Sequence, residues 1–331
     1  MKSIHLGGPP PANPLGALAT FGLFRVVCQD LGQPNLQLSW QLCDDWRPVL
    51  HLPEDLEQDQ LESALFSHLQ ADQDWSVWSD MDEIKMPVNT YGALLQKLVE
   101  QASPQERLEV DRAGAFASEG RCLKPPKSDI VKPMPLDMAS GRQKFLTMIQ
   151  DVRKSILNAD PEKLQQFLYG PWEYAPGKLS FGWDPESIRA HGYQARDPAN
   201  NLNGSKKTST DPDDQGEVAT GVEMAIWFAF EALPLLPVAP GRTGISCSAF
   251  APATGLRQDN GEFRWPVWET PLSLRAVRFL LQSSDLVMST DSPAGLVRLR
   301  QRGICRIYQA QKADTAGAEK RKSLHFGEAL F

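Results

Sequence analysis

The residues best suited to chemistry in this sequence are cations placed where they could bind phosphate. Ser140-Gly141-Arg142-Gln143 has the pattern of a capping box, with Ser140 as the N-cap and Gln143 at the third helical position. The free N–H groups of a helix start carry partial positive charge, and Arg142 and Lys144 lie in that predicted first turn. Because cations there oppose the helix dipole, an anionic partner would relieve the conflict. We predict a phosphate contact, the alternative being two solvated cations on an ordinary helix.

A long polar segment, residues 191–216, is a second candidate for nucleic-acid contact. Segments of this length within a compact domain are often functional or disordered. Lys and Asn side chains suit contacts to phosphates and to base edges. The predicted binding residues in and beside this segment are Arg189, Arg196, Asn201, Lys206 and Lys207. A basic run near the end of the chain adds Lys320, Arg321 and Lys322. A solvated loop is the alternative interpretation.

Three aromatic residues near these cations could stack on bases. Trp172 and Tyr174 follow a predicted helix over 161–169, and Tyr193 lies in the polar segment. Aromatic rings bind bases of any sequence through their π-faces. Aromatic residues beside Gly and Pro are more often core or corner residues, and we favour that interpretation.

The sequence contains none of the familiar catalytic constellations. It has no GxSxG elbow, Walker loop, HExxH pair or kinase motif set. Histidines such as His51 and His191 have no partner at a useful spacing, which favours surface or packing roles. Asp137 suits helix capping, and Asp184 suits a turn. We predict that the chain is not an enzyme; the alternative is a metal-dependent nuclease using Asp137, Asp184 or Glu186.

Cysteine usage and hydropathy limit the class of protein further. The chain has 5 cysteines, far apart and without a CxxC pair or a Cys/His cluster at metal-ligand spacing. We expect reduced cysteines, no metal and no cofactor. The most apolar stretch, Val222 to Leu233, is too short for a membrane span, which needs roughly 20 residues. No apolar leader is visible at the N-terminus. These features predict a cytoplasmic protein without membrane partners.

Charge is distributed unevenly along the chain. The net charge is −7, which argues against a simple nucleic-acid binder. Residues 41–111 carry 16 acidic and 4 basic side chains, whereas residues 112–210 carry 10 acidic and 15 basic ones. Residues 242–331 carry 8 acidic and 13 basic side chains. An acidic front that faces protein or solvent and a mildly basic remainder that can face phosphates would fit this pattern.

Hydrophobic periodicity predicts an α+β fold, with a mainly antiparallel sheet and packed helices. The predicted helices cover residues from 14, 53–69, 90–101, from 140, 161–169, 222–233 and 271–282. The predicted strands are 36–42, 49–52, 179–183, 245–250, 262–268 and 303–309. We divide the chain into an acidic N-terminal α+β region over 1–113, a linker over 114–135 and a C-terminal α+β region with basic loops over 136–331. A single compact unit is the alternative.

Several short motifs, in a fixed order over nearly the whole chain, carry a family resemblance. The motifs are Leu6-Gly7-Gly8-Pro9, Pro14-Leu15, Leu18 to Arg25, Leu136 to Leu146, Tyr169 to Trp172, Phe181 to Pro185, Tyr193 to Pro198, Glu223 to Pro237, Phe263 to Trp268, Pro271 to Leu274 and Arg302-Gly303-Ile304. Together they resemble a group of subunits from type I CRISPR–Cas loci of the I-U (I-G) kind. Such subunits are regarded as large-subunit-like components of the Cascade surveillance complex. Gly8 stands where that group commonly has a cysteine.

The resemblance implies a non-catalytic role in antiviral defence. It implies partners of three kinds: other Cascade subunits, a crRNA and double-stranded target DNA. Subunits of this kind help to recognise the short motif beside the target and to hold the opened DNA, while guide pairing reads the sequence. Cutting would need a separate helicase–nuclease. A purely structural adaptor that contacts only protein is a further alternative.

Overall fold

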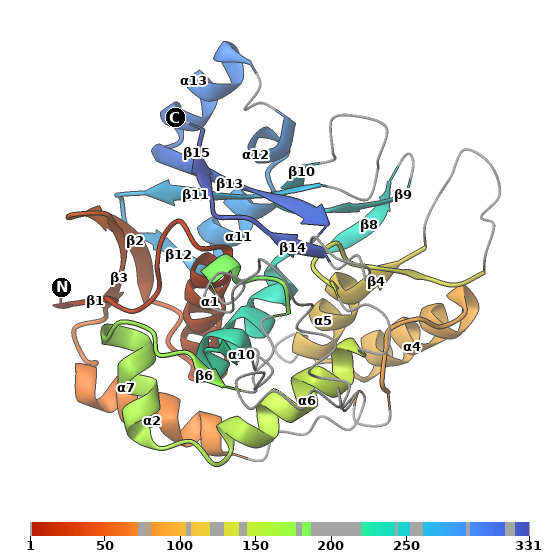
Figure 1. The fold of residues 1–331 in the computed structure, drawn as a ribbon, viewed down its shortest axis with the longest axis horizontal. Helices are drawn as coiled ribbons and strands as arrows, with labels where there is room; N and C mark the ends of the chain where they lie inside the picture. The colour runs from red at the N-terminus through yellow and green to blue at the C-terminus, as the bar shows by residue number, and fades with distance from the viewer. Residues whose placement is uncertain are drawn as a thin grey trace, which may run out of the picture.

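Figure 1 shows the computed structural model of the chain as a ribbon. The structure describes residues 2–71, 78, 81–103, 107–119, 129–138, 144–176, 181–186, 220–241, 244–251, 261–288, 292–314 and 322–330. Within these ranges, no helix combines the length and the apolar character that a bilayer crossing requires.

Helices and antiparallel strands are mixed along the chain, which confirms the predicted α+β class. The α-helices are α1 (Pro14–Arg25), α2 (Gln58–Gln70), α4 (Val88–Gln101), α5 (Leu108–Phe116), α6 (Phe145–Ile156), α7 (Pro161–Tyr169), α10 (Glu223–Ala232), α11 (Leu274–Gln282), α12 (Ser284–Met288) and α13 (Pro293–Gln301). The strands are β1 (Lys2–His5), β2 (Gln37–Leu42), β3 (Trp46–Leu52), β4 (Ala117–Ser118), β5 (Lys132–Pro133), β6 (Ala175–Pro176), β7 (Thr220–Gly221), β8 (Val238–Gly241), β9 (Gly244–Cys247), β10 (Phe250–Ala251), β11 (Glu262–Trp268), β12 (Leu272–Ser273), β13 (Ile304–Asp314), β14 (Lys322–Leu324) and β15 (Glu328–Ala329).

The N-terminal sheet has the strand order β1-β3-β2-β12, and every pairing in it is antiparallel. β2 and β3 overlap the predicted strands over 36–42 and 49–52 and form a hairpin, in which Leu42 pairs with Trp46. Alternation turns Leu38 and Trp40 to the inner face, where both are buried. Leu42 has the same parity but lies at the end of the hairpin and is 58% exposed. Because β12 comes from the C-terminal part of the chain, both ends of the sequence build this sheet.

The C-terminal sheet has the order β10-β11-β13-β14, and β15 also pairs with β13. The predicted strand over 245–250 is divided in the structure, because residues 248–249 form a turn in which Ala249 has φ 58°. Residues 244–247 are β9, which pairs with β8, and β10 begins at Phe250, opposite Phe263 of β11. Pro266 lies within β11, and a proline in a strand favours an edge or bulge position because it has no N–H group for the ladder. β10 covers only the first two residues of β11, and the register shifts between Val267 and Trp268. The proline therefore lies where the ladder tolerates a missing N–H group.

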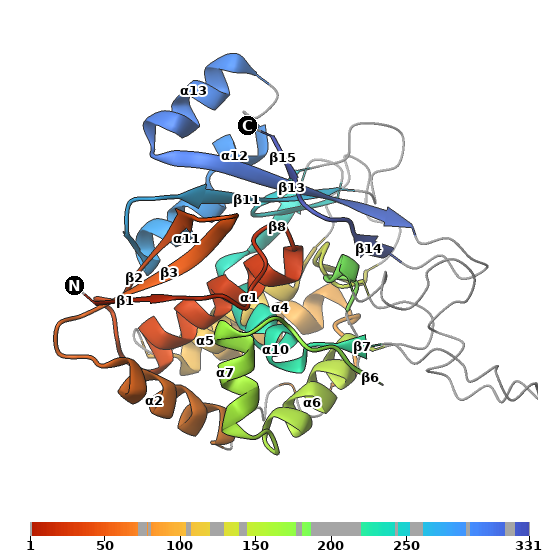
Figure 2. The same cartoon turned by 60° about the vertical axis from the view of Figure 1, so that its left-hand side comes forward.

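Two buried helices, α1 and α10, cross at the centre of the molecule. Every residue of α1 is buried, and every residue of α10 except Glu223 is buried. In Figures 1 and 2 the pair lies between the sheets and the layer made by α2, α6 and α7. The helices approach closely because Gly22 has no side chain: a Cβ atom there would lie 1.6 Å from the carbonyl oxygen of Phe228. The prediction of a buried helix over 222–233 is confirmed.

The interface of these two helices contains charged side chains. Glu231 of α10 accepts hydrogen bonds from Arg25 of α1 and from Arg112 of α5, the latter at 2.7 and 2.8 Å. The exposed fractions of the three side chains are 1%, 0% and 3%. Arg112 also pairs with Glu109. Burial would raise the pKa of Glu231, but Arg112 and Arg25 hold it below its usual value.

A π-helical turn at the end of α1 places a second carboxylate on Arg25. The turn spans Val26–Asp30. Its wider winding brings residue i+5 back over residue i, and Arg25 donates to both carboxylate oxygens of Asp30 at 3.0 Å. His68 of α2 lies 3.6 Å from Asp30. The π-turn therefore has a local purpose, since it satisfies a guanidinium that is fully buried.

The described residues of the N-terminal and C-terminal parts share one hydrophobic core. Phe21 of α1, Trp40 of β2 and Trp268 of β11 contact one another with ring centroids 6.3–6.4 Å apart. The segment expected to be a linker also enters this core. Phe116, at the end of α5, is fully buried, and Val131 is 3% exposed.

One predicted strand is wrong. Residues 181–182 form a turn, in which Phe181 has φ 57° and Gly182 has φ 73°. Alternating Phe181 and Trp183 suggested a strand, but both rings are buried on Phe145, whose centroid lies 5.7 and 6.2 Å from theirs. Tertiary packing determines the backbone conformation here, because the left-handed turn at Phe181 and Gly182 points the rings of Phe181 and Trp183 into the core.

Candidate nucleic-acid interface

Lys144 is the predicted binding residue whose side chain the structure describes, and it is already paired. It occupies the N-cap position of α6, and its ammonium group donates to the carboxylate of Asp82. Thr147 Oγ1 donates to the same carboxylate at 3.3 Å. The backbone oxygen of Asp82 accepts from the N–H groups of Leu146 and Thr147 at 3.1 and 3.3 Å. Asp82 therefore caps α6 with its backbone and neutralises Lys144 with its side chain.

The pKa values of this pair follow from the contact. The hydrogen bond from Lys144 lowers the pKa of Asp82, and the same bond raises the pKa of Lys144. The two side chains, Lys144 and Asp82, are 45% and 63% exposed. Water and salt therefore screen the pair, and a competing phosphate could displace the carboxylate.

The predicted capping box is wrong. α6 begins at Phe145, so Ser140 cannot be its N-cap and Lys144 is not in its first turn. The cap comes instead from Asp82, which is 62 residues away from Lys144 in the sequence. Local patterns cannot reveal a partner at that separation. Ser140 and Arg142 lie outside the described residues.

Most of the other predicted binding residues also lie outside the described residues. These residues are Arg189, Arg196, Asn201, Lys206, Lys207, Lys320 and Arg321. Lys322 belongs to strand β14, and its backbone lies opposite that of Asp314 in the register of β13 and β14. The nucleic-acid role of this set stays a prediction.

The carboxylate of Asp184 is buried and makes hydrogen bonds within the protein. It is fully buried and accepts from the side-chain amide of Asn13 at 2.8 Å. It also accepts from the backbone N–H of Glu186 at 2.9 Å, which agrees with the predicted turn. Burial, and next the nearby Asp184, raise the pKa of Tyr174, which hydrogen bonds to this carboxylate. Asp184 thus joins the start of α1 to the segment after β6.

The metal-dependent nuclease needs clustered ligands, and Asp137 was its other main candidate. The backbone N–H of Asp137 donates to Met134 in a turn, at 3.0 Å. Among the described residues, no group of three or more His, Cys, Asp or Glu side chains is placed to hold a metal ion.

The aromatic residues considered for base stacking pack against the protein. Trp172 stacks on Phe167, with centroids 6.1 Å apart and an interplanar angle of 24°. Its indole N–H donates to the backbone oxygen of Phe167 at 3.3 Å. Tyr174 bonds to Asp184, as described above, and Tyr193 lies outside the described residues. Trp172 and Tyr174 therefore have the corner role that we favoured.

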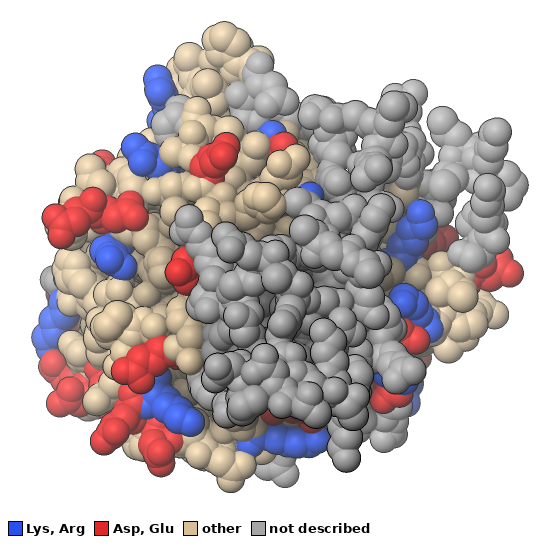
Figure 3. Space-filling view, viewed as in Figure 1, with Lys and Arg blue, Asp and Glu red and all other residues tan. Residues whose placement is uncertain are grey.

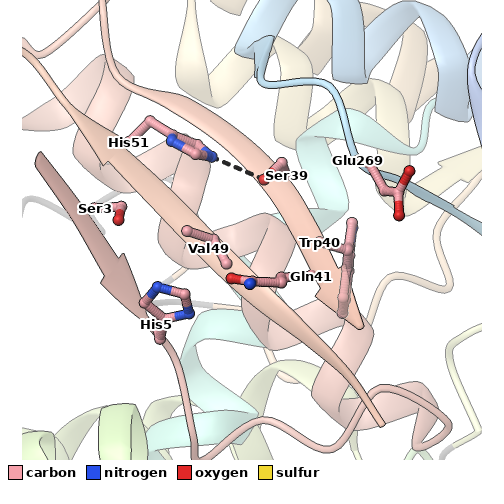
Figure 4. Close-up of a pocket in the computed structure, with 8 residues that line it drawn as sticks. All are labelled: Ser3, His5, Ser39, Trp40, Gln41, Val49, His51 and Glu269. Carbon is pink, nitrogen blue, oxygen red and sulfur yellow. Dashed lines mark hydrogen bonds between the residues drawn. The ribbon is translucent and has the colours of Figure 1, made fainter. Parts of the chain in front are cut away.

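A hollow that we did not predict lies on the outer face of the N-terminal sheet (Figure 4). Its volume is about 260 Å³. β1, β2 and β3 supply most of the lining, and one residue comes from the turn after β11. The lining residues are Ser3, His5, Ser39, Trp40, Gln41, Val49, His51 and Glu269. Polar side chains predominate, so this face is suited to hydrogen bonding.

Ser39 and His51 form the central contact of the hollow. Ser39 Oγ and His51 Nε2 lie 2.8 Å apart, and Ser39 is 4% exposed. Burial, and next the nearby His5, lower the pKa of His51, so its imidazole is neutral at pH 7. A hydroxyl beside a neutral imidazole is half of a nucleophile–base arrangement, which also needs a group that orients the base. In the described part of the chain no carboxylate bonds to His51, and Glu269 lies beyond β2 (Figure 4).

A sequence signal for this face did exist. The alternation that predicts an inner side for Leu38 and Trp40 also places Gln37, Ser39 and Gln41 on the outer side. The sequence favours a packing or surface role for His51 because it has no partner at a useful spacing, whereas its partner Ser39 comes from the other strand of the hairpin. Only the register of β2 and β3 brings Ser39 and His51 together.

Comparison with known proteins identifies no relative: no family model, no curated protein and no solved structure matches this chain.

Proposed function

We propose that this chain is a non-catalytic subunit of a CRISPR RNA-guided surveillance complex of the Cascade type. In this role it binds other Cascade subunits, a crRNA and double-stranded target DNA, and a separate helicase–nuclease cuts the target. The proposal places the protein in the cytoplasm. It rests on the ordered motifs that resemble large-subunit-like proteins of type I loci.

The observation that carries the proposal is that these motifs contact one another in the fold. The opening motif meets the motif at 169–172: a Cβ on Gly7 would lie 2.6 Å from the backbone oxygen of Tyr169. Arg25, at the end of the α1 motif, pairs with Glu231 of the α10 motif, 206 residues away. The indole N–H of Trp183 donates to the backbone oxygen of Leu136 at 2.8 Å. Motifs far apart in the sequence are therefore direct neighbours.

This arrangement explains why the motifs would recur together. Changes at residues in direct contact are coupled in energy, so shared motifs that meet in the core would describe a shared scaffold. The resemblance then concerns the scaffold, and we assign binding to the basic residues at 189–207 and 320–322. Of these, Lys322 belongs to β14, and the others lie outside the described residues.

The charge distribution supports the same division. Figure 3 shows acidic side chains gathered at the lower left of the drawn face, over α2. Glu57 and Asp59, at the start of α2, are both exposed. An acidic surface repels phosphate and suits a protein neighbour that presents cations. We assign the acidic front to contacts with other subunits.

The experiment that tests the proposal is affinity purification of the tagged full chain from its native cells. Mass spectrometry would identify bound proteins, and sequencing would identify bound RNA. We expect short repeat-derived RNA together with other CRISPR-associated proteins. Recovery of a monomer without RNA or partners would contradict the proposal, and recovery of protein partners without RNA would favour the adaptor.

A salt titration tests the predicted phosphate contacts. The logarithm of the binding constant should fall linearly with the logarithm of salt concentration, with a slope that reflects the number of phosphates contacted. The Lys206→Ala/Lys207→Ala variant should weaken DNA binding by the assembled complex and reduce that slope by about one unit per lost contact. The matched control is Lys154→Ala, because Lys154 is exposed and paired with Asp151. An unchanged slope would contradict the assignment of Lys206 and Lys207.

A further inference from the structure

The outer face of the N-terminal sheet is a polar platform built from three adjacent strands. The register aligns His5 of β1, Val49 of β3 and Ser39 of β2 in one row. The row beside it contains His51, opposite both Ser3 and Gln37. We call this surface, defined by His5, Gln37, Ser39, Gln41 and His51, the histidine face.

The histidine face has a floor and raised sides. Ser39 and Val49 are 4% and 3% exposed, so they form the floor. His5 and Gln41 are exposed, and His51 is partly exposed. Figure 4 shows the rings of His5 and His51 on β1 and β3, with Gln41 on the neighbouring strand β2. The hollow of about 260 Å³ lies among them.

The chemistry of these groups matches an unpaired base. Imidazole rings can stack on bases, and amide and hydroxyl groups can bond to base edges. Since His51 is neutral at pH 7, its contact would come from stacking and hydrogen bonding and not from charge. A protein partner would instead use a buried aromatic or aliphatic anchor in a pocket. Here the two apolar residues that line the hollow, Val49 and Trp40, are 3% and 1% exposed, so neither is available as an anchor.

Charge at the rim sets the orientation of a bound strand. Arg47 of β3 is partly exposed and donates to the backbone oxygen of Gly7 at 2.9 Å. Glu269 lies beyond β2, on the other side of the hollow (Figure 4). A phosphate is attracted by Arg47 and repelled by Glu269, whereas the carboxylate of Glu269 can accept from a base amino group. The backbone of the strand should therefore run on the side of β3.

We propose that the histidine face binds one or two unpaired nucleotides of a single-stranded nucleic acid. The inference rests on the proposed nucleic-acid role and adds a second kind of contact to it. Basic loops would supply a salt-dependent attraction to phosphates, and this face would supply a base contact that depends little on salt.

The test compares two fluorescent single-stranded 12-mers, one with bases and one abasic, in titrations of the full chain followed by anisotropy. The His5→Ala/His51→Ala variant should bind the base-containing 12-mer about fivefold more weakly, given the usual contribution of base–aromatic stacking. Its binding of the abasic 12-mer and its salt slope should not change. His51→Gln keeps a hydrogen-bonding group for Ser39 but has no aromatic ring, and it should show part of the loss. His325→Ala is the matched control, because His325 is exposed and lies outside this face.

Each outcome decides the inference separately from the proposed function. Equal weakening on both 12-mers, no weakening in the double variant, or no binding by the wild-type chain would each overturn the histidine face as a base site. Displacement of the 12-mer by a free mononucleotide at equal concentration would also overturn it in favour of a nucleotide pocket. None of these results bears on whether the chain purifies with repeat-derived RNA and CRISPR-associated proteins. Crosslinks from a 4-thiouridine strand to β1, β2 or β3 would support the assignment.

Discussion

The α1–α10 interface and the start of α6 both contain a carboxylate that pairs with a cation, but in opposite surroundings. Glu231 is 1% exposed and is shared by two guanidinium groups that are 0% and 3% exposed. Asp82 is 63% exposed and pairs with one lysine that is 45% exposed. In the first pair water is excluded, and in the second it competes.

The difference teaches which charges the fold depends on. Removing one member of a buried pair leaves an uncompensated charge in a medium that solvates it poorly. Removing one member of an exposed pair returns the other to water at little cost. The buried set therefore belongs to the scaffold, and the exposed pair can be exchanged for another partner.

The largest expected effect is that of Glu231→Gln, which keeps the shape of the side chain and removes its charge. Arg25 and Arg112 would both face a neutral amide, so the free energy of unfolding should fall by about 3–5 kcal/mol. Chemical denaturation measures this change. The control on the same helix is Glu223→Gln. Glu223 is partly exposed and accepts from Ser155 Oγ at 2.6 Å, and its replacement should cost less than about 1.5 kcal/mol. If the two variants lost the same amount of unfolding free energy, burial would not determine how much each carboxylate contributes to stability.

Two glycines, one in the buried α1–α10 interface and one on the surface helix α4, allow the same comparison between buried and exposed positions without a change of charge. A Cβ on Gly22 would lie 1.6 Å from the oxygen of Phe228 and 2.8 Å from the nitrogen of Ala232, both backbone atoms of the buried pair. Gly22→Ala must push the helices apart and should destabilise the fold by about 1–3 kcal/mol. A Cβ on Gly92 of α4 would have no such neighbour within 4 Å, so Gly92→Ala should stabilise the fold by about 0.5–1 kcal/mol. The sign of the two changes in thermal midpoint checks the comparison.

His68 connects the buried charges to solvent, and its titration gives a smaller effect. Burial lowers its pKa, while Asp30 and Glu231 oppose the shift and Arg25 and Arg153 add to it. The usual pKa of histidine is 6.5, and His68 keeps this value in the unfolded chain. Below pH 6.5 the unfolded chain therefore binds more protons than the folded protein, so the free energy of unfolding should fall as the pH decreases through 6.5. His68→Gln should flatten the unfolding free energy between about pH 8 and pH 5.5. The lowered pKa of His51 acts with the same sign, so part of the slope should persist. If His68→Gln leaves the slope of unfolding free energy against pH unchanged, the titration of His68 does not contribute to stability.

The sequence predicts the parts of this fold that depend on local periodicity. The helix over Pro161–Tyr169 and the strand over Glu262–Trp268 are both confirmed with the predicted bounds. Both have patterns that repeat over several turns or residues. The turn at Phe181 depends on packing against a distant side chain, Phe145. The π-turn after Arg25 depends on the contact between Arg25 and Asp30, whose spacing of five residues belongs to neither the helix period nor the strand period.

The candidate site follows the same rule. Lys144 could be selected as a cation near a helix start, but its partner Asp82 lies in a segment with no local link to α6. Ser39 and His51 each follow a predicted alternation, yet their contact depends on the register of the hairpin. Residues whose role depends on one neighbour in space, and not on a repeated pattern, are those that sequence reasoning misses here.

The smallest expected effect on stability, and the sharpest test of exchangeability, is that of Asp82→Asn. The amide can still accept from Thr147, and the backbone oxygen still caps α6, so the thermal midpoint should stay unchanged within error. Lys144 loses its anionic partner, so nucleic acid should bind more tightly and the salt slope should increase by up to about one unit. The matched control is Asp151→Asn, which frees Lys154 on the same helix but away from its start. If both variants raise affinity equally, net charge alone is responsible. If neither does, the start of α6 does not face phosphate, and Lys144–Asp82 is an ordinary surface ion pair.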